Sequence, residues 1–453
     1  MEIIRLGTIE IPIDNPFVFI WWFFTTIGWI IPVFFFCWGL VLGYQNWIRT
    51  EYRKKRKYIL LAIDIPKNNE QTLRAVENFF NHLSGAHQPL KFNHKWWKGE
   101  VPESFAFEIV SIGGQIQYII HFVDIYRDLV EAAIYAQYPE AIITEVEDYT
   151  KRWNIKMPND TWQIFGTELK LNISDVYPIV TYENFEDPMS DEIKDPMSGI
   201  LESMNRVGPD EEMWLQILVT PADNDWGRKA KPIINKIIGA KQKSKKDFLY
   251  YFTYIPQMVL DGLTPAAGES PKGNDAPNQM LYLTEGEKND VKAIQRKTGK
   301  TGYHVRIRWI YIMPKAKYST TKALHTVYGA FKQYNSLGSN GFKNDSRYLC
   351  ASIVFMKKTR LIWRRNRMMI RYKNRGHFFS PGEYGFILNS EELAGLWHFP
   401  TLGVKAPLVQ RLESKRAEPP GTLPVVDSFG NAMTTAKTMP RKGPTPNNLP
   451  RTG

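Results

Sequence analysis

Two patterns of hydrophobic residues divide the chain. Residues 15–48 contain no charged side chain, and Phe, Trp, Ile, Val and Leu dominate from residue 17 onward. About 20 apolar residues suffice for a helix to span a bilayer, whereas a hairpin of two spans needs roughly twice that number and a turn. A buried core helix rarely runs this long without a polar face. The pattern therefore predicts one transmembrane helix over residues 17–48.

Residues 58–150 alternate between the patterns of strands and of amphipathic helices. The predicted elements, in chain order, are a strand (58–66), a helix (70–84), two strands joined at Gly113-Gly114 (104–122), a helix (126–138) and a strand (141–146). This order is that of the ferredoxin-like split βαβ unit, in which both helices cover one face of an antiparallel sheet. We therefore expect a ferredoxin-like domain over residues 58–150.

A second α/β unit is predicted over residues 212–356, after a connector (151–211) that is rich in Asp and Glu. Its predicted strands are 213–220, 303–313 and 348–355, and its predicted helices are 225–238, 285–297 and 320–334. A mobile loop is predicted over residues 241–284, because Pro, Gly and Asp are frequent in residues 262–278.

The last hundred residues change from helical patterns to a polar, Pro-rich sequence. We predict a basic amphipathic helix over residues 357–376 and a helix with an extended segment over 377–416. Asn389 and Glu392 have the spacing of a capping box for a helix at 390–396. Residues 417–453 have few large apolar groups and are predicted to form a disordered tail. The predicted fold class is α+β, with one transmembrane helix, two ferredoxin-like units and this tail.

The formal net charge of +12 is concentrated in two segments. The first follows the predicted span directly and contains Arg49, Arg53, Lys54, Lys55, Arg56 and Lys57. Basic residues beside a span favour the cytoplasmic side, so the net negative residues 1–16 are expected outside and the rest of the chain in the cytoplasm. This predicts a single-pass protein of the plasma (inner) membrane. Recognition of anionic lipid is the alternative role of this juxtamembrane segment.

The second basic segment, residues 357–375, has nine Lys and Arg residues and no acid. Spacings of three and four place six of them on one stripe of a helix. The stripe comprises Lys357, Arg360, Arg364, Arg367, Arg371 and Arg375. Such a stripe can bind nucleic-acid phosphates, anionic lipid or an acidic protein surface, and residues 183–195 of this chain offer one. The sequence leaves these three anionic partners open.

Motifs of known catalytic and metal chemistry are missing from the sequence. Cys37 and Cys350 lie far apart, which supports neither a disulfide framework nor a cysteine metal site. His82, His87 and His94 lack the spacing of metal ligands on a helix, so we interpret them as solvated loop histidines. We predict a protein that is not an enzyme and needs no cofactor.

Several runs, in their order and spacing, resemble one family over nearly all of residues 58–424. They are PESFAFEIVSIGG (102–114) together with residues 126–149, 195–221, 302–316, 328–336, 386–400 and 404–424. These runs resemble the region that precedes the motor domain in bacterial type IV secretion and conjugative-transfer ATPases. In those ATPases a nucleotide-binding domain follows the Pro-rich segment, whereas this sequence continues for only about thirty residues after Pro424.

A phosphate loop is also missing from the region of resemblance. Gly299-Lys300-Thr301 supplies the end of such a loop, but Ile294 stands where its first glycine is needed, and a strand pattern follows instead of a helix. The resemblance therefore implies a membrane-anchored scaffold or adaptor of a type IV secretion-like (conjugative transfer) machine. It would position a separate ATPase or a substrate at the cytoplasmic membrane face, and the sequence leaves homo-oligomers and DNA open as partners. The alternative is a membrane-associated nucleic-acid-binding protein that uses the basic helix 357–375.

Overall fold

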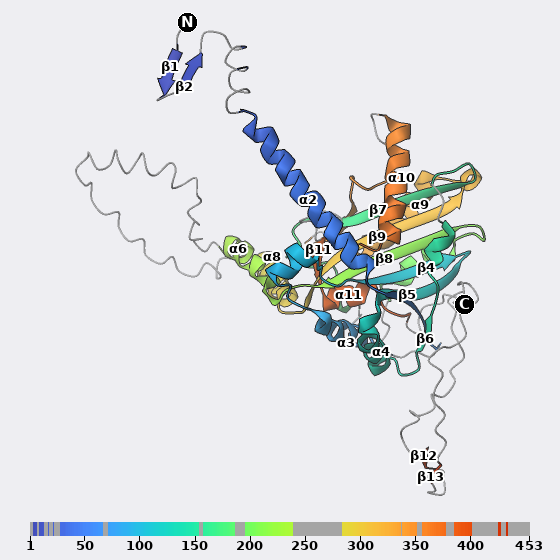
Figure 1. Cartoon of the computed structure of the whole chain (residues 1–453). Helices are drawn as coiled ribbons and strands as arrows, with labels where there is room; N and C mark the ends of the chain where they lie inside the picture. Colours follow the sequence, from blue (N-terminus) through green and yellow to red (C-terminus); the bar gives the residue numbers. More distant parts are fainter. Residues whose placement is uncertain are drawn as a thin grey trace, which may run out of the picture. The chain divides into compact units, whose positions relative to one another are not determined.

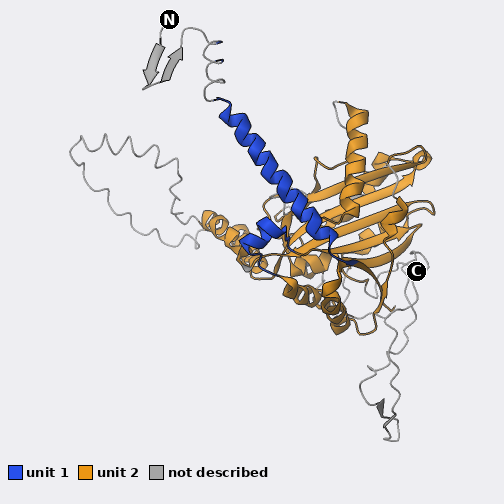
Figure 2. Cartoon of the chain, viewed as in Figure 1, with its two compact units in different colours: residues 1–58, 88–102, 378–383 blue, residues 59–87, 103–377, 384–453 orange. Residues whose placement is uncertain are grey.

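The chain divides into two compact units in the computed structural model (Figure 2). The structure describes residues 3–6, 9–12, 17, 21, 28–66, 71–153, 157–185, 195–238, 283–336, 338–350, 356–376, 385–400, 425–426 and 432–433. The predicted mobile loop lies outside these residues except for its last two, 283 and 284. The predicted disordered tail also lies outside them, apart from the paired strands β12 (Val425–Val426) and β13 (Ala432–Met433).

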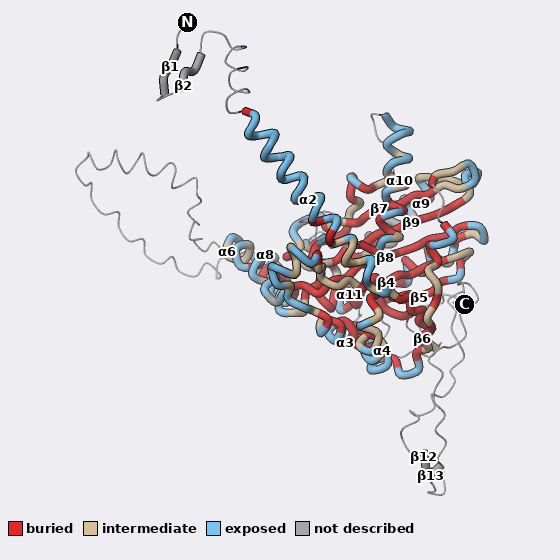
Figure 3. Tube along the Cα trace, in the orientation of Figure 1, coloured by how far each residue is buried: buried red, intermediate tan, exposed pale blue. Residues whose placement is uncertain are grey.

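The first unit contains an N-terminal hairpin and a long apolar helix. The hairpin joins β1 (Ile3–Leu6) and β2 (Ile9–Pro12), and the helix is α2 (Ile30–Lys54). Among the described residues, α2 is the one helix long and apolar enough to cross a membrane. Its apolar side chains are largely exposed (Figure 3). Residues 30–48 of the predicted span and most of the basic segment 49–57 therefore belong to one helix, which ends six residues later than predicted, and most of residues 17–27 lie outside the described part of the chain.

A short helical turn of the same unit packs beside the end of α2. It is η3 (His94–Lys98), and Gly99 follows it with a left-handed φ of 69°. A Cβ atom on Gly99 would lie 2.6 Å from the backbone carbon of Ile48. Only glycine combines this φ with so close an approach of two backbones. The contact explains why Ile48 is buried in a helix whose only other buried residue is Gln45.

The second unit is built on one nine-stranded sheet, as far as the structure describes it (Figure 1). Its strands are β3 (Tyr58–Asp64), β4 (Phe105–Ile112), β5 (Gln115–Val123), β6 (Ile142–Glu145), β7 (Trp162–Leu171), β8 (Glu212–Pro221), β9 (Gly302–Pro314), β10 (Phe342–Asn344) and β11 (Phe386–Asn389). The order is β10-β7-β9-β8-β4-β5-β3-β6, and β11 pairs with the beginning of β9. Antiparallel pairing predominates, which confirms the predicted α+β class.

Both halves of the sheet have the same arrangement of strands along the chain. The first half reads β6-β3-β5-β4 and the second reads β10-β7-β9-β8, so each places its strands in the order fourth, first, third, second. The halves join where β4 pairs antiparallel with β8, from Phe105↔Val219 to Ile112↔Glu212. The two predicted units therefore share one continuous sheet.

Helices cover both faces of this sheet. The helices of the second unit are α3 (Leu73–Leu83), α4 (Arg127–Gln137), α5 (Ser198–Asn205), α6 (Ala230–Ile237), α8 (Glu285–Thr298), α9 (Thr320–Phe331), α10 (Lys357–Lys373) and α11 (Ser390–Leu396). α3 packs on Phe107 of β4 through Phe80, and α9 packs on Trp309 of β9 through Phe331. α10 contacts the neighbouring residue Arg308, which points to the opposite face because successive strand side chains alternate. α10 thus lies on the face opposite to α3 and α9.

Local sequence signals explain several elements. The Gly113-Gly114 turn between β4 and β5 has φ values of 58° and 86°, as a two-residue hairpin loop requires. At α11, Glu392 N donates to Asn389 Oδ1 (2.8 Å) and Asn389 N donates to Glu392 Oε2 (2.9 Å), which confirms the predicted capping box. α11 is wholly buried, and the following Trp397 packs on Phe107.

Three secondary-structure predictions are corrected. Residues 151–211 contain the strand β7 and the helix α5, so this segment is more than a connector. The strand predicted at 348–355 is not formed at 348–350, where the structure describes it, and the edge strand is β10, a few residues earlier. The helix predicted at 225–238 begins as the 3-10 turn η7 (Asn224–Lys229) and becomes α-helical only in α6.

Candidate functional site

A row of polar side chains crosses four adjacent strands beneath α10. Glu108 of β4 pairs with Gln216 of β8, Gln216 pairs with Arg308 of β9, and Arg308 pairs with Glu168 of β7. Residues directly opposite each other in a sheet point to the same face. All four side chains are buried, so the row forms a charged seam in the interior.

Hydrogen bonds connect the row from end to end. Arg308 Nε donates to Glu168 Oε1 (2.7 Å), and Arg308 Nη1 donates to Gln216 Oε1 (3.1 Å). Gln216 Nε2 then donates to Glu108 Oε1 (2.7 Å). Burial lowers the pKa of Arg308 to about 10 although Glu168 opposes the shift, which still leaves the guanidinium charged at neutral pH.

The C-terminal end of α10 places two more arginines over the row. Arg371 Nε donates to Glu168 Oε1 (3.2 Å). Arg375 Nε donates to Glu108 Oε1 (2.8 Å), and Arg375 Nη1 donates to Asp148 Oδ2 (2.6 Å). Buried charges are stable only when they are paired and hydrogen-bonded. The carboxylates of the sheet therefore fix this end of α10.

Arg375 also has an unusual backbone. It follows the C-cap of α10 with a φ of 44°, in the left-handed region where glycine is the usual residue. This conformation costs a non-glycine residue roughly 1–2 kcal/mol. The bonds to Glu108 and Asp148 explain why an arginine is held there.

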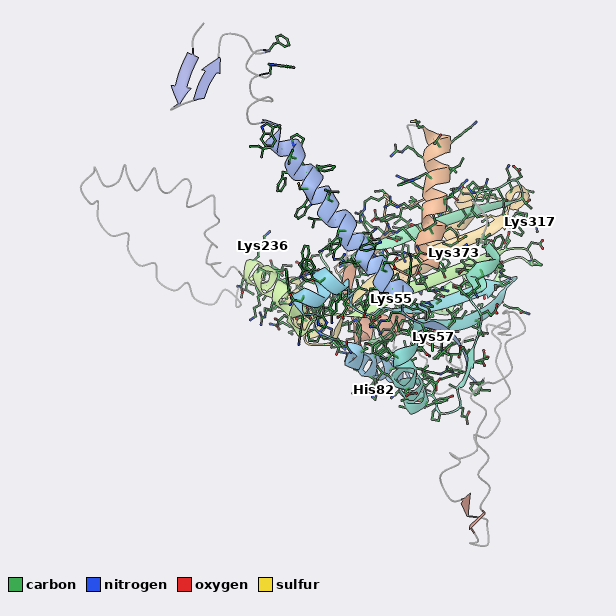
Figure 4. The ribbon with its side chains drawn as sticks, in the orientation of Figure 1. Lys55, Lys57, His82, Lys236, Lys317 and Lys373 are labelled. Atoms are coloured by element: carbon green, nitrogen blue, oxygen red, sulfur yellow. The ribbon has the colours of Figure 1, made fainter. Side chains whose placement is uncertain are left out.

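Two buried tyrosines complete the network. Tyr149 Oη donates to Glu108 Oε2 (3.0 Å) and lies 2.9 Å from Tyr372 Oη. Burial, reinforced by the charge of Glu108, raises the pKa of both hydroxyls well above the usual value. Both tyrosines are therefore neutral hydrogen-bonding groups at physiological pH. Nearby, Lys373, labelled in Figure 4, donates from Nζ to the Trp153 carbonyl (2.6 Å).

Asp148 gives the network a dependence on pH. Burial alone would raise the pKa of Asp148, but the Arg375 guanidinium outweighs it and lowers this pKa to about 2. A carboxyl whose folded pKa is depressed stabilises the fold fully above its unfolded pKa and loses that contribution as the pH falls through its folded pKa. We expect Asp148 to contribute about 2 kcal/mol of stability that disappears between about pH 5 and pH 2.

Substituting Asp148→Asn tests this expectation in urea unfolding at several pH values. The free-energy difference between the wild type and the variant should be largest near pH 6 and should shrink toward pH 2. Burial raises the pKa of Asp64, Glu212 and Glu392, which opposes acid unfolding, but these groups occur in both proteins. A difference that does not change with pH would contradict the role of Asp148.

The structure divides the predicted basic stripe. Arg371 and Arg375 are buried and paired within the chain. Arg364 Nη1 donates to the Leu349 carbonyl (3.0 Å), and Lys357, Arg360 and Arg367 remain exposed. The six residues therefore do not share one surface. Their internal acidic partners are Glu108, Asp148 and Glu168, outside the predicted segment 183–195.

The juxtamembrane cluster lies in the first unit, at the end of α2 and just after it. Arg49 Nη2 donates to Gln45 Oε1 (3.0 Å), and Lys54 pairs with Glu51 (2.8 Å). Arg56 donates to the Tyr52 hydroxyl. The remaining members are Arg53, Lys55 and Lys57. Each of these three contacts joins residues three or four positions apart, and Lys54, Lys55 and Lys57 are exposed.

A cavity of about 630 Å³ lies between α8, the segment 178–181 and the loop that follows α9. Apart from Lys292, its charged lining is paired: Arg296 contacts Glu183 and Glu391, and buried Lys297 lies 3.0 Å from Glu392. This pairing leaves little uncompensated charge with which to attract an ionic ligand.

The triplet Gly299-Lys300-Thr301 follows α8, with Gly299 as the C-cap. Lys300 Nζ binds Glu391 (2.8 Å) and Glu77 (2.7 Å). Its ammonium group therefore forms ion pairs with two carboxylates of the chain. Phosphate loops place the lysine before a helix, whereas here it follows one.

The three histidines predicted to lie in loops are apart from one another, and the prediction is wrong for His82, which is in the last turn of α3. In the second unit, His87 lies 3.1 Å from Asp223. In the first unit, His94 lies 2.9 Å from Glu100. Where the structure describes the chain, no group of three or more His, Cys, Asp or Glu side chains could hold a metal ion.

Sequence reasoning did not single out the buried row. Glu108 stands within the apolar run FAFEIV, and Arg308 stands within RIRWIYI. A charged residue inside a buried strand is a signal, because its desolvation must be offset by a partner. The arginines that bind Glu168 lie 138 or more residues away from it in the chain, so sequence spacing alone does not identify them.

Comparison with known proteins gives a family without an assigned activity. Residues 44–411 match a family described as a domain of unknown function (DUF8128). The matched range contains the end of α2, the sheet with its charged row, α10 and α11. Among curated proteins, none matches the chain. Because the match covers well over half of the sequence, the protein belongs to the DUF8128 family.

Proposed function

We propose that this protein is a membrane-anchored, non-catalytic scaffold of a type IV secretion-like machine for conjugative transfer. It would position a separate ATPase or a transfer substrate at the cytoplasmic face of the membrane. The observation that carries this proposal is the exposed apolar helix α2. The helix ends at Lys54, and three residues, Lys55–Lys57, connect it to β3. So short a link spans at most about 14 Å, which keeps the first strand near the end of the anchor.

The direction of the anchor follows from its charge. The basic residues gather at the C-terminal end of α2, and its exposed aromatic residues, such as Trp29 and Trp38, precede them. The positive-inside rule then leaves residues 1–16 outside and the sheet in the cytoplasm.

The order of strands in the sheet supports the predicted ferredoxin-like units. In each half of the sheet, the strand order fourth, first, third, second is that of a split βαβ unit. α3 and α9 lie on the same face, as the helices of such units do. We infer two ferredoxin-like units joined through β4 and β8.

A scaffold is favoured over an enzyme and over a DNA-binding protein by the use of the charged groups. Glu108, Glu168 and Arg308 form hydrogen bonds inside the sheet unit. This pairing stiffens the sheet unit as a platform and leaves the three side chains unavailable for catalysis. Arg371 and Arg375, two of the six residues predicted to bind an anionic partner, are also internal. The runs that resemble the transfer ATPases include β4, β8, β9 and α11, so the resemblance lies in the core of the platform.

Cysteine labelling in intact cells tests the anchor. In a Cys37→Ser background, Arg5→Cys should react with an impermeant maleimide from outside, whereas Ile125→Cys should react only after lysis. Cys350 is a silent background because burial raises the pKa of its thiol to about 12. Reaction of Ile125→Cys in intact cells would reverse the proposed orientation.

Cross-linking in the same membranes tests the scaffold. We expect cross-links from the sheet unit to a separate ATPase subunit of a transfer machine, and deletion of the gene should abolish conjugative transfer. Normal transfer after deletion, or neighbours that include no transfer component, would refute the proposed function even if the anchor is correct.

A further inference from the structure

α10 has two ends with different surroundings. Toward its C-terminal end, Met368, Met369 and Tyr372 join the core of the sheet unit. At its N-terminal end, residues 356–360 are all exposed (Figure 3). The helix has 17 residues and is about 25 Å long, so its free end stands clear of the charges that fix the other end.

The outward surface of α10 is unexpectedly apolar. Met356 is 59% exposed, and Trp363 and Ile370 are each 56% exposed. Ile362 beside them is also exposed. The core-facing side of the helix has its own apolar residues, so these four exposed residues are not needed for packing against the core. Grouped exposed apolar residues mark a surface that binds a protein, a membrane or a ligand.

The same surface is strongly basic. Lys357, Lys358 and Arg360 are exposed, and among the described residues none forms a salt bridge with them. Arg367 lies over the Trp363 ring, with 4.8 Å from its guanidinium carbon to the ring centre. α10 contains no acidic residue. The surface therefore combines Trp, Ile and Met with uncompensated positive charge.

We propose that this surface, Met356–Arg360 with Ile362, Trp363, Arg367 and Ile370, docks on the anionic headgroup layer of the membrane that α2 spans. Interfacial helices combine Lys and Arg with Trp and other apolar residues that reach the acyl boundary, and tryptophan favours the headgroup level. Phosphates of DNA would neutralise the charges but would leave Ile362 and Ile370 without an apolar environment. Lipid matches both properties of the surface.

This inference rests on the proposed membrane anchor. α2 confines the chain to the membrane, which raises the effective concentration of lipid at every part of the sheet unit. A second contact at α10 would fix the orientation of the sheet unit on the membrane. The rigid attachment of α10 through Arg371 and Arg375 transmits that orientation to the sheet.

Fluorescence quenching in reconstituted full-length protein tests the docking. An environment-sensitive fluorophore is attached at Thr359→Cys, an exposed polar position on α10, in the Cys37→Ser background. The matched control is Ala136→Cys, an exposed position on α4. Vesicles contain brominated phosphatidylcholine, with or without phosphatidylglycerol. We expect quenching at position 359 only with phosphatidylglycerol, and none at position 136.

Two sets of variants separate charge from apolar contact. Lys357→Gln with Lys358→Gln should weaken docking roughly 25-fold, because each basic residue contributes about fivefold at an anionic surface. Ile362→Ala with Trp363→Ala should abolish the quenching while the melting temperature stays unchanged, since both side chains are exposed.

The outcomes distinguish this inference from the proposed function. Protein that floats with the vesicles but shows no quenching at position 359 would refute docking and leave the anchor intact. Protein that does not float would refute the anchor and the docking with it. Fluorescence at position 359 that responds to a DNA duplex and not to phosphatidylglycerol would assign the surface to nucleic acid and overturn the inference.

Discussion

Replacing Arg375 by alanine is expected to lower the free energy of unfolding by about 3–5 kcal/mol, the range for breaking a buried ion pair by removing one partner. Arg375 is 4% exposed and binds Glu108 and Asp148 through two nitrogen atoms each. Its loss leaves the carboxylate of fully buried Glu108 without an arginine. Urea unfolding of the detergent-solubilised full chain, followed by circular dichroism, measures the change.

Two controls separate charge from other effects of this substitution. Arg367→Ala removes an exposed arginine from the same helix and should change stability by less than about 0.5 kcal/mol. Arg375→Gly removes the same ion pairs but suits the φ of 44°, so it should be less destabilising than Arg375→Ala by roughly 1 kcal/mol. Equal stability of Arg375→Ala and the wild type would show that the network does not fix α10.

Local patterns were sufficient where neighbouring residues decide the structure. The hairpin at Gly113-Gly114 depends on two residues that accept positive φ, and the cap of α11 depends on Asn389 and Glu392, three positions apart. α3 was predictable because its buried residues, from Leu73 to Leu83, repeat at helical spacing.

Patterns failed where the partner is distant in the chain. β7 contains Gly166 and Glu168, which weaken the appearance of a buried strand. Gly166 lies under Met368 of α10, where a Cβ would come within 2.6 Å of the Met368 side chain. Glu168 is buried because arginines from β9 and α10 reach it. None of these contacts is encoded in local periodicity.

The same limit applies to the candidate site. Periodicity placed six basic residues of α10 on one stripe, but it does not show which side of a helix faces the core. Nine basic residues without an acid suggested a surface that binds an anionic partner. The structure turns Arg371 and Arg375 inward because Glu108 and Glu168 on the sheet offset their desolvation. Trp363 and Ile370 are exposed on the same helix, and the distribution of charge along the sequence does not predict this.

Glu168 is expected to be the second sensitive position. Arg306, Arg308 and Arg371 all donate to this one carboxylate, at 3.2, 2.7 and 3.2 Å. Glu168→Gln keeps the shape of the side chain but removes the negative charge that the three guanidinium groups share. We expect a loss of about 3–5 kcal/mol at pH 7, because buried arginines are left without a counter-charge.

The pH dependence of that loss has a definite sign. Burial alone would raise the pKa of Glu168, but the three arginines outweigh burial and lower it. The stabilisation from Glu168 is therefore complete above the unfolded pKa of a glutamate, about 4.3, and disappears as the pH falls through the lower folded pKa. The difference between wild type and Glu168→Gln should shrink in acid, since protonated Glu168 resembles glutamine. A difference that grows on acidification would contradict the assigned pairing.

A double-mutant cycle with Arg371 decides whether the contact itself carries the effect. Arg371→Met alone should be destabilising, because Glu168 loses the one arginine donated by α10. In the Glu168→Gln background the same substitution should cost less, because it removes a buried charge that has already lost its partner. We expect a coupling free energy of about 1–3 kcal/mol between the two positions, as for residues in one ion-pair network. Additive losses would mean that α10 is held by the packing of Met368, Met369 and Tyr372, and that the charged row serves the sheet alone.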